Sequence, residues 1–156
     1  MPEHPAVLRV ETALADAGVV TQVVWLDGAA KTAAEAAAAL GIEVGAIANS
    51  LVFLLDGEPV LVMTSGSHRV DTEWLGARVG GVFSRADATT VKNATGQVIG
   101  GIAPVGHPAP LRTFVDSSLA DYPEIWAAAG HAHTVFPLSY AQLVAVTNGT
   151  VTPVVA

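Results

Sequence analysis

Residues 100–110 are the segment that most constrains how this chain can fold, because three glycines and three prolines surround a single histidine. Glycine lacks the Cβ that would block close approach to a ligand, and proline fixes φ at about −65°. Main-chain NH groups held in this way suit carbonyl or phosphate oxygens. A tight crossing between two strands would use the same residue types. The segment therefore either presents its backbone to a ligand or connects two strands.

Length and hydropathy favour one globular domain over residues 1–156. A chain of 156 residues is long enough to form its own core, since a domain of this size buries about 70% of its unfolded surface. Hydrophobic residues make up 51% of the sequence, but no run approaches the roughly 20 apolar residues that span a bilayer. The first five residues lack the cationic start and apolar core of a signal peptide. We therefore expect a cytoplasmic protein without a membrane segment.

Cysteine content and charge exclude several classes of function. The chain has no cysteine, so disulfides, thiolate nucleophiles and cysteine metal sites are all excluded. With 7 basic and 14 acidic residues, it should not attract nucleic acid by broad electrostatics. Any nucleic-acid contact must therefore be local, or a partner must supply it.

Local signals predict short helices and strands in an irregular order. Pro5 and Gly18 bound the first helix, and the capping box Thr32–Glu35 opens a second helix that ends at Gly41. Further helices are expected after the caps Asp71 and Asp87, and after a second capping box at Ser139–Gln142. Strands are expected over residues 19–26, 50–55, 60–64, 111–115, 125–129 and 151–155, with residues 56–59 joining the second and third strands as a hairpin. This order, without regular βαβ alternation, predicts an α+β domain with a mixed, mostly antiparallel sheet.

Common catalytic and metal motifs are absent from the sequence. It contains no Gly-x-Ser-x-Gly elbow, no phosphate loop ending in Gly-Lys-Ser/Thr and no Gly-x-Gly-x-x-Gly. His131 and His133 would share one face of an extended segment, with His68 and His107 as possible further metal ligands. No carboxylate follows at diagnostic spacing, and an exposed polar pair explains the pattern equally simply. We expect no metal and no cofactor.

Three polar residues are candidates for contacting a ligand. His107, beside the glycine-rich segment, could move a proton or could brace the loop; with no visible partner, bracing is favoured. Asn49 and Ser50 precede a predicted strand, where consecutive side chains point to opposite faces, so one of them can enter a pocket. Both are small and neutral, and both could instead cap the strand.

The order of four segments resembles the YbaK/EbsC family. The segments are residues 32–41, 47–53, 100–107 and 116–130, and the similarity runs from Ala6 to Val155. This family is related to the editing insertion domain of bacterial prolyl-tRNA synthetases and to free-standing trans-editing deacylases. These proteins hydrolyse the ester bond that joins a wrongly attached amino acid to tRNA. The resemblance implies a barrel-like sheet flanked by helices, and the acceptor 3′ end of an aminoacylated tRNA as substrate.

The family's Gly-x-x-x-Pro loop falls on Gly100–Pro104. The resemblance implies that this loop shapes the substrate pocket, through Gly100, Gly101, Ile102, Ala103 and Pro104. Physical chemistry is consistent with that role, because an aminoacyl ester is already activated. Orienting the ester in a closed pocket, with water or the vicinal ribose hydroxyl as participant, could provide much of the rate. We expect Gly101→Val to abolish function without unfolding the domain.

One position departs from the family pattern. The lysine of the family's Val-Lys-Thr-Leu-Val-Phe-like segment aligns with Asn49, which can hydrogen-bond but cannot neutralise charge. Lys31 could supply the missing cation, or could be an ordinary solvated lysine.

The resulting prediction is an aminoacyl-tRNA deacylase that acts in trans, with a synthetase as a possible partner. The catalytic candidates are Asn49, Gly100, Gly101 and His107. Lys31, Thr32 and Ser50, with Ile102, Ala103 and Pro104, are the candidates for substrate binding. The alternative is a binding module for a tRNA end or small ligand that lost turnover together with the lysine.

Overall fold

The computed structural model describes residues 4–30 and 32–156. The helices are α1 (Pro5–Asp16), α2 (Ala33–Leu40), α3 (Thr72–Val79), α4 (Ala88–Thr95) and α5 (Tyr140–Thr147), with 3-10 helices η1 (Val44–Ala46) and η2 (Ser117–Asp121). The strands are β1 (Val24–Trp25), β2 (Ala48–Leu55), β3 (Glu58–Ser65), β4 (Phe83–Arg85), β5 (Arg112–Asp116), β6 (Ile125–Ala127), β7 (Thr134–Leu138) and β8 (Thr150–Thr152).

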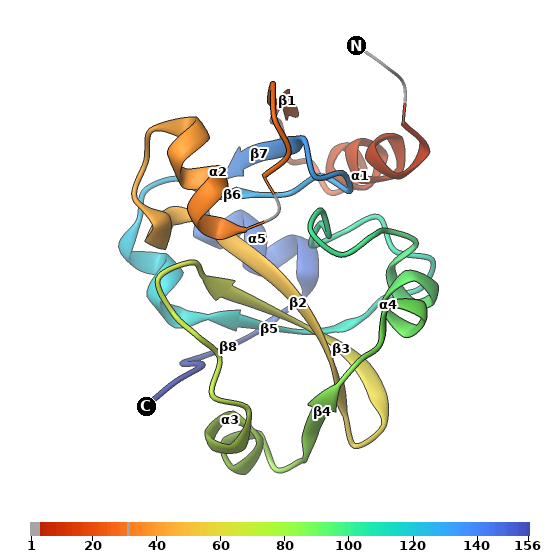
Figure 1. Ribbon diagram of the computed structural model, residues 1–156, viewed down its shortest axis with the longest axis vertical. Coiled ribbons are helices and arrows are strands. Elements are labelled where there is room, and N and C mark those ends of the chain that lie inside the picture. The colour runs from red at the N-terminus through yellow and green to blue at the C-terminus, as the bar shows by residue number, and fades with distance from the viewer. Residues whose placement is uncertain (1–3, 31) are drawn as a thin grey trace.

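The strands form two sheets. The larger has the order β4-β2-β3-β5-β8 and the smaller has the order β1-β7-β6 (Figure 1). In the larger sheet, β2 pairs antiparallel with β3 and β4, whereas β5 pairs parallel with β3 and β8. The smaller sheet is antiparallel. The predicted α+β class with mixed sheets is confirmed, but the described strands form two open sheets joined at the Ile47–Trp126 bridge, not a closed barrel.

The hairpin between β2 and β3 provides the long central strands of the molecule. Asp56 and Gly57 connect the two strands, and both have positive φ, 51° and 85°. Two consecutive residues with positive φ form the tight turn whose twist matches that of paired strands. The predicted hairpin is confirmed, and its register places Asn49 opposite Thr64 and Ser50 opposite Met63.

The main core lies between the hairpin, α1 and the smaller sheet. Val7, Val10 and Leu14 recur at helical spacing on the buried face of α1. They belong to the same cluster as Leu61 and Met63 of β3, which are fully buried. In Figure 1, α1 and the smaller sheet lie above the hairpin, while α3 and β4 lie at its other end.

The predicted strand over residues 19–26 is mostly irregular. Only Val24–Trp25 pairs, with β7, and Val20 is 96% exposed. Strands β4 and β7 were not predicted. Strand β7 contains Pro137, which removes a backbone donor and makes its segment a poor strand candidate by sequence pattern alone. In the described part of the chain, no helix is long and apolar enough to cross a membrane.

Candidate functional site

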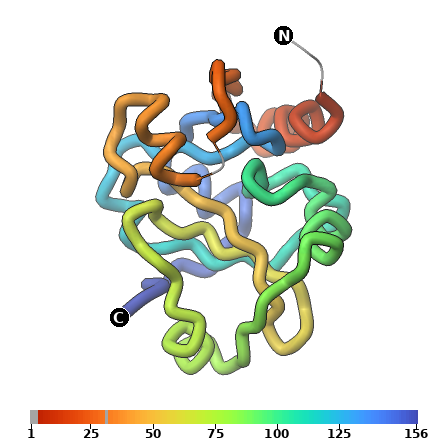
Figure 2. The backbone as a smooth tube through the Cα atoms, in the orientation of Figure 1, coloured from red at the N-terminus to blue at the C-terminus, as the bar shows by residue number. Residues whose placement is uncertain are grey.

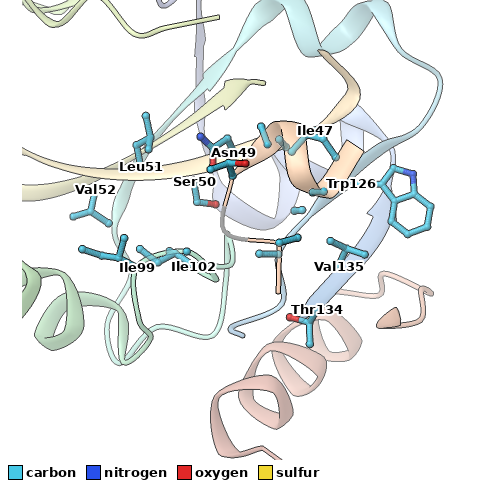
Figure 3. Close-up of a pocket in the computed structure, with 18 of the residues that line it drawn as sticks. Ile47, Asn49, Ser50, Leu51, Val52, Ile99, Ile102, Trp126, Thr134 and Val135 are labelled. Carbon is cyan, nitrogen blue, oxygen red and sulfur yellow. The ribbon is translucent and has the colours of Figure 1, made fainter. Parts of the chain in front are cut away.

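A pocket of about 340 Å³ lies along the first half of β2. Residues 48–53 form one wall, and Ile99, Gly100 and Ile102 form the wall facing it. Trp126 and Val135 contribute from the smaller sheet. Figure 3 shows Ser50 and Val52 projecting from β2 toward Ile99 and Ile102. The pocket therefore lies where the hairpin, the glycine-rich segment and the smaller sheet meet.

This part of β2 is an open sheet edge. Strand β4 pairs only with Phe53–Leu55, and the bridge to Trp126 involves Ile47. Between these points, no described strand pairs with residues 48–52 on the side opposite β3. An open edge presents unpaired backbone N–H and C=O groups. The pocket can therefore offer main-chain hydrogen bonds to a ligand from β2 itself.

Asn49 and Ser50 both line this pocket. The Ser50 hydroxyl donates to Sδ of Met63 at 3.1 Å, which directs it to the main core side of the sheet. The strand alternation directs Asn49 to the other face. Within residues 4–30 and 32–156, no hydrogen bond to the Asn49 carboxamide is found, and Figure 3 shows this side chain on the other side of β2 from Ser50.

The glycine-rich segment contributes only part of its length to the pocket. Gly100, with φ +98°, and Ile102 line it. Gly101, Ala103 and Pro104 are buried but are not among the lining residues. The N–H of Gly101 donates to Val98 O at 3.2 Å, and the N–H of Ala103 donates to Gln97 Oε1 at 2.7 Å. The predicted main-chain donors at these two positions are therefore used inside the loop.

Gly101 requires a correction of its expected role. An ideal Cβ on this residue would lie 2.5 Å from the carbonyl carbon of His131 and 2.7 Å from the nitrogen of Ala132. Gly101 O also accepts from the N–H of Gly130 at 2.8 Å. In Figure 2 the segment after α4 passes next to the segment that leads into β7. Gly101 thus permits close backbone packing behind the pocket wall, and a side chain there would disturb the fold.

His107 braces the loop and lies outside the pocket lining. Its Nε2 is 2.9 Å from Ala103 O, a contact in which Nε2–H is the donor. Burial lowers the pKa of His107 below its ordinary value, and the bond to Ala103 offsets this only in part. A neutral imidazole that already uses Nε2 does not fit a proton shuttle. The contact with Ala103 supports the bracing role, and the catalytic role considered for His107 stays a prediction.

Thr32 lines the pocket, but its hydroxyl belongs to the helix cap. Thr32 Oγ1 accepts from the N–H of Glu35 at 3.1 Å, and Glu35 Oε1 accepts from the N–H of Thr32 at 3.2 Å. The predicted capping box is confirmed. Lys31, the residue considered as a replacement cation, lies outside the described residues.

The histidine pair does not form a metal centre with other described side chains. Across residues 4–30 and 32–156, no three His, Asp or Glu side chains are arranged to hold an ion. His131 Nδ1 accepts from the N–H of His133 at 3.0 Å, and its ring packs against His4. Burial, then the charges of His4 and His133, lower the pKa of His131.

A buried carboxylate at the ends of β3 and β5 was missed by sequence reasoning. The Asp116 side chain is 1% exposed, and its Oδ2 lies 2.9 Å from His68 Nδ1. It accepts the N–H groups of Ser65 and Ser118, each at 3.0 Å. Burial raises the pKa of Asp116, but these hydrogen bonds outweigh burial and hold the pKa below its ordinary value. Asp116 does not line the pocket, so it acts as a structural anchor.

The pocket wall is apolar with a few neutral polar groups. Among the described lining residues, the polar side chains are Thr32, Asn49, Ser50 and Thr134. Ile99, 61% exposed, and Trp126 were not singled out from the sequence. The alternation of the predicted strand at residues 125–129 was a usable signal for Trp126, since its neighbours Ile125 and Ala127 point into the core.

The fold is that of an aminoacyl-tRNA editing domain. The model of the family described as "Aminoacyl-tRNA editing domain" matches residues 27–146, more than half of the chain. The chain therefore belongs to this family, and the resemblance to YbaK-type proteins is confirmed.

Known proteins extend this similarity. A crystal structure of a protein proposed to be a trans-editing enzyme for prolyl tRNA synthetase is 38% identical, with a TM-score of 0.91 over 97% of this chain and 98% of that one. The hypothetical protein APE2540 is 26% identical, with a TM-score of 0.86 over 94% of this chain and 98% of that one. The uncharacterized protein YwhH of Bacillus subtilis (strain 168) is 26% identical over 72% of each chain.

Proposed function

We propose that this protein is a trans-acting aminoacyl-tRNA deacylase that hydrolyses the ester of a wrongly charged tRNA. The observation that carries this proposal is the pocket of about 340 Å³ between the open edge of β2 and Gly100. Membership of the editing-domain family supports the same activity. The acceptor 3′ end, with its aminoacyl group, is the proposed ligand.

The proposed chemistry needs no protein nucleophile. Water, oriented by the vicinal ribose hydroxyl, adds to the ester carbonyl, the bond from that carbon to the ribose oxygen breaks, and the ribose oxygen takes the proton that the water releases. With water as attacking group, the products are the free amino acid and uncharged tRNA. The chain supplies orientation through the Asn49 carboxamide and the β2 backbone, while Gly100 allows close approach. Apolar walls limit access of bulk water to the ester.

A second candidate is a non-catalytic binding module, and one observation favours it. The family resemblance implies a lysine at the position of Asn49, and the described lining side chains carry no charge. An amide hydrogen-bonds a carbonyl or hydroxyl but does not neutralise a phosphate or a developing oxyanion as a cation does. Such a pocket could retain binding while turnover is lost.

A panel of mischarged tRNAs separates the two candidates. The native protein, Asn49→Ala and Asn49→Lys are each incubated with the panel, and release of amino acid and binding of tRNA are measured. The deacylase proposal predicts a rate above background for at least one native combination and a lower rate for Asn49→Ala. Binding without release would favour the module, and absence of both would contradict both candidates.

A synthetase partner is proposed because the chain is acidic. Its net charge of −7 opposes general attraction to the phosphate backbone. A partner that holds the tRNA would raise the local concentration of the charged 3′ end. The corresponding measurement is the KM for mischarged tRNA with and without a stoichiometric synthetase, which we expect to fall when the cognate synthetase is present.

A further inference from the structure

We propose that Gln97 is a positioning residue whose buried side chain sets the geometry of the pocket wall at Gly100 and Ile102. The inference rests on the proposed function for its kinetic consequence. Its structural basis is independent of that function, because it concerns the hydrogen bonds inside the loop.

Gln97 uses both ends of its carboxamide within the loop. The residue is 1% exposed. Its Oε1 accepts from the N–H of Ala103 at 2.7 Å, and its Nε2 donates to Val105 O at 3.1 Å. One planar side chain therefore fixes a donor and an acceptor two residues apart. This arrangement defines the path of the backbone immediately after Ile102.

The backbone of Gln97 is itself anchored to α4. Its N–H donates to Thr95 Oγ1 at 3.0 Å. The Thr95 hydroxyl donates to Val91 O at 2.7 Å, inside the helix, and Thr95 is fully buried. Val91 also lines the pocket. The amide of Gln97 is thus held at a fixed position relative to the pocket, so it can serve as a reference point for the loop.

Ala103 is held on both sides by side chains. Gln97 Oε1 accepts a hydrogen bond from the Ala103 N–H, and His107 Nε2–H donates to the Ala103 carbonyl oxygen at 2.9 Å. Ile102 comes immediately before Ala103 in the chain. Gly100, with its positive φ of 98°, lies two residues before Ile102. A change at Ala103 would therefore move Gly100 and Ile102, which line the pocket, although Gln97 itself is not a lining residue.

Only some side chains can satisfy this site. Methionine would leave the Ala103 N–H and Val105 C=O buried without those partners. An ionised glutamate accepts but does not donate, so it would face the Val105 oxygen with a negative charge. A protonated glutamic acid reproduces the amide, since its carbonyl accepts from Ala103 and its O–H donates to Val105. Burial next to a carbonyl oxygen should raise the pKa of a glutamate placed here.

The test is the pH profile of Gln97→Glu, relative to the native protein. In this variant the protonated side chain of the introduced glutamate gives the active form, and its pKa is raised. The kcat/KM of the variant divided by that of the native protein should therefore rise about tenfold or more as the pH falls from about 8 to about 5. Gln97→Met should show a loss of about tenfold or more that does not vary with pH. Gln142→Glu is the matched control, because Gln142 accepts from the Ser139 N–H in a helix cap where glutamate also fits.

Two readouts separate positioning from general stability and from failure of the proposed function. In Gln97→Glu, NMR should show the Gly100 and Ile102 amide resonances moving with the same pH midpoint as the introduced carboxyl group, while thermal unfolding confirms a folded protein. A ratio of variant to native kcat/KM that does not vary with pH would overturn the inference. Loop resonances that do not shift as the carboxyl group titrates would overturn it as well. If the native protein hydrolyses no mischarged tRNA, the proposed function fails, and the NMR midpoints still decide the role of Gln97.

Discussion

Gly101 packs so closely on His131 that an ideal Cβ on the glycine would lie 2.5 Å from the histidine carbonyl carbon. This contact joins the glycine-rich segment to the segment that leads into β7. The atoms nearest to that Cβ, in His131 and Ala132, are backbone atoms. They cannot rotate away as a flexible side chain can. Close approach at Gly101 therefore serves chain packing.

Gly101→Ala should lower the free energy of unfolding by about 1–3 kcal/mol, the usual cost of overpacking. Urea denaturation measures this change. Gly28→Ala is the matched control, because a Cβ at Gly28 meets nothing within 4 Å. Equal stability of Gly101→Ala and the native protein would contradict the close packing.

Thr32→Ala should reduce stability by about 1 kcal/mol through loss of the helix cap. Thr32→Ser keeps a hydroxyl and should behave like the native protein in thermal unfolding. Because the Thr32 hydroxyl is used by Glu35, tRNA affinity should change little in either variant. A large loss of affinity in the alanine variant, with unchanged stability, would show that Thr32 binds substrate directly.

Asp116→Asn should lower the free energy of unfolding at pH 7 by about 1.5–3 kcal/mol, as expected for hydrogen bonds to a buried charged group. The N–H groups of Ser65 and Ser118 donate to different oxygens of the native carboxylate, so the amide NH2 would face one of these two donors. Asp121→Asn, at an exposed position on η2, is the control and should have little effect.

The Asp116 effect should also depend on pH in a defined direction. Its folded-state pKa is lower than the ordinary value of 3.8. The stabilisation from ionisation is therefore present above that value and is lost as the pH falls through the folded-state pKa. Thermal unfolding of the native protein and Asp116→Asn should converge on acidification below about pH 4. A stability difference that stays constant across this range would contradict the assignment.

The features that sequence predicted well depend on residues close together in the chain. Two capping boxes, at Thr32 and Ser139, and the turn at Asp56–Gly57 all appear as expected. Each uses hydrogen bonds or dihedral preferences within four residues. Strand β4 was missed because its three residues gain their pairing from β2, and nothing in so short a segment indicates a strand.

The site was predictable only in part for the same reason. Asn49 and Gly100 line the pocket, whereas Gly101 and His107 do not. A run of glycines and prolines indicates a shaped loop, but it does not show which side of the loop faces a cavity. That choice is made by Gln97, whose hydrogen-bond partners are fixed only when the loop folds back on it.

Filling the pocket is the most direct test of the central claim, which is that this cavity holds the aminoacyl ester during hydrolysis. Ala128 lines the pocket and is half-buried, whereas Ala38 is exposed on α2 and does not line it. The measurement is the initial rate of amino acid release from a mischarged tRNA by the native protein, Ala128→Leu and Ala38→Leu. We predict a loss of about tenfold or more for Ala128→Leu and a native rate for Ala38→Leu. A folded Ala128→Leu variant that hydrolyses the ester at the native rate would contradict the account.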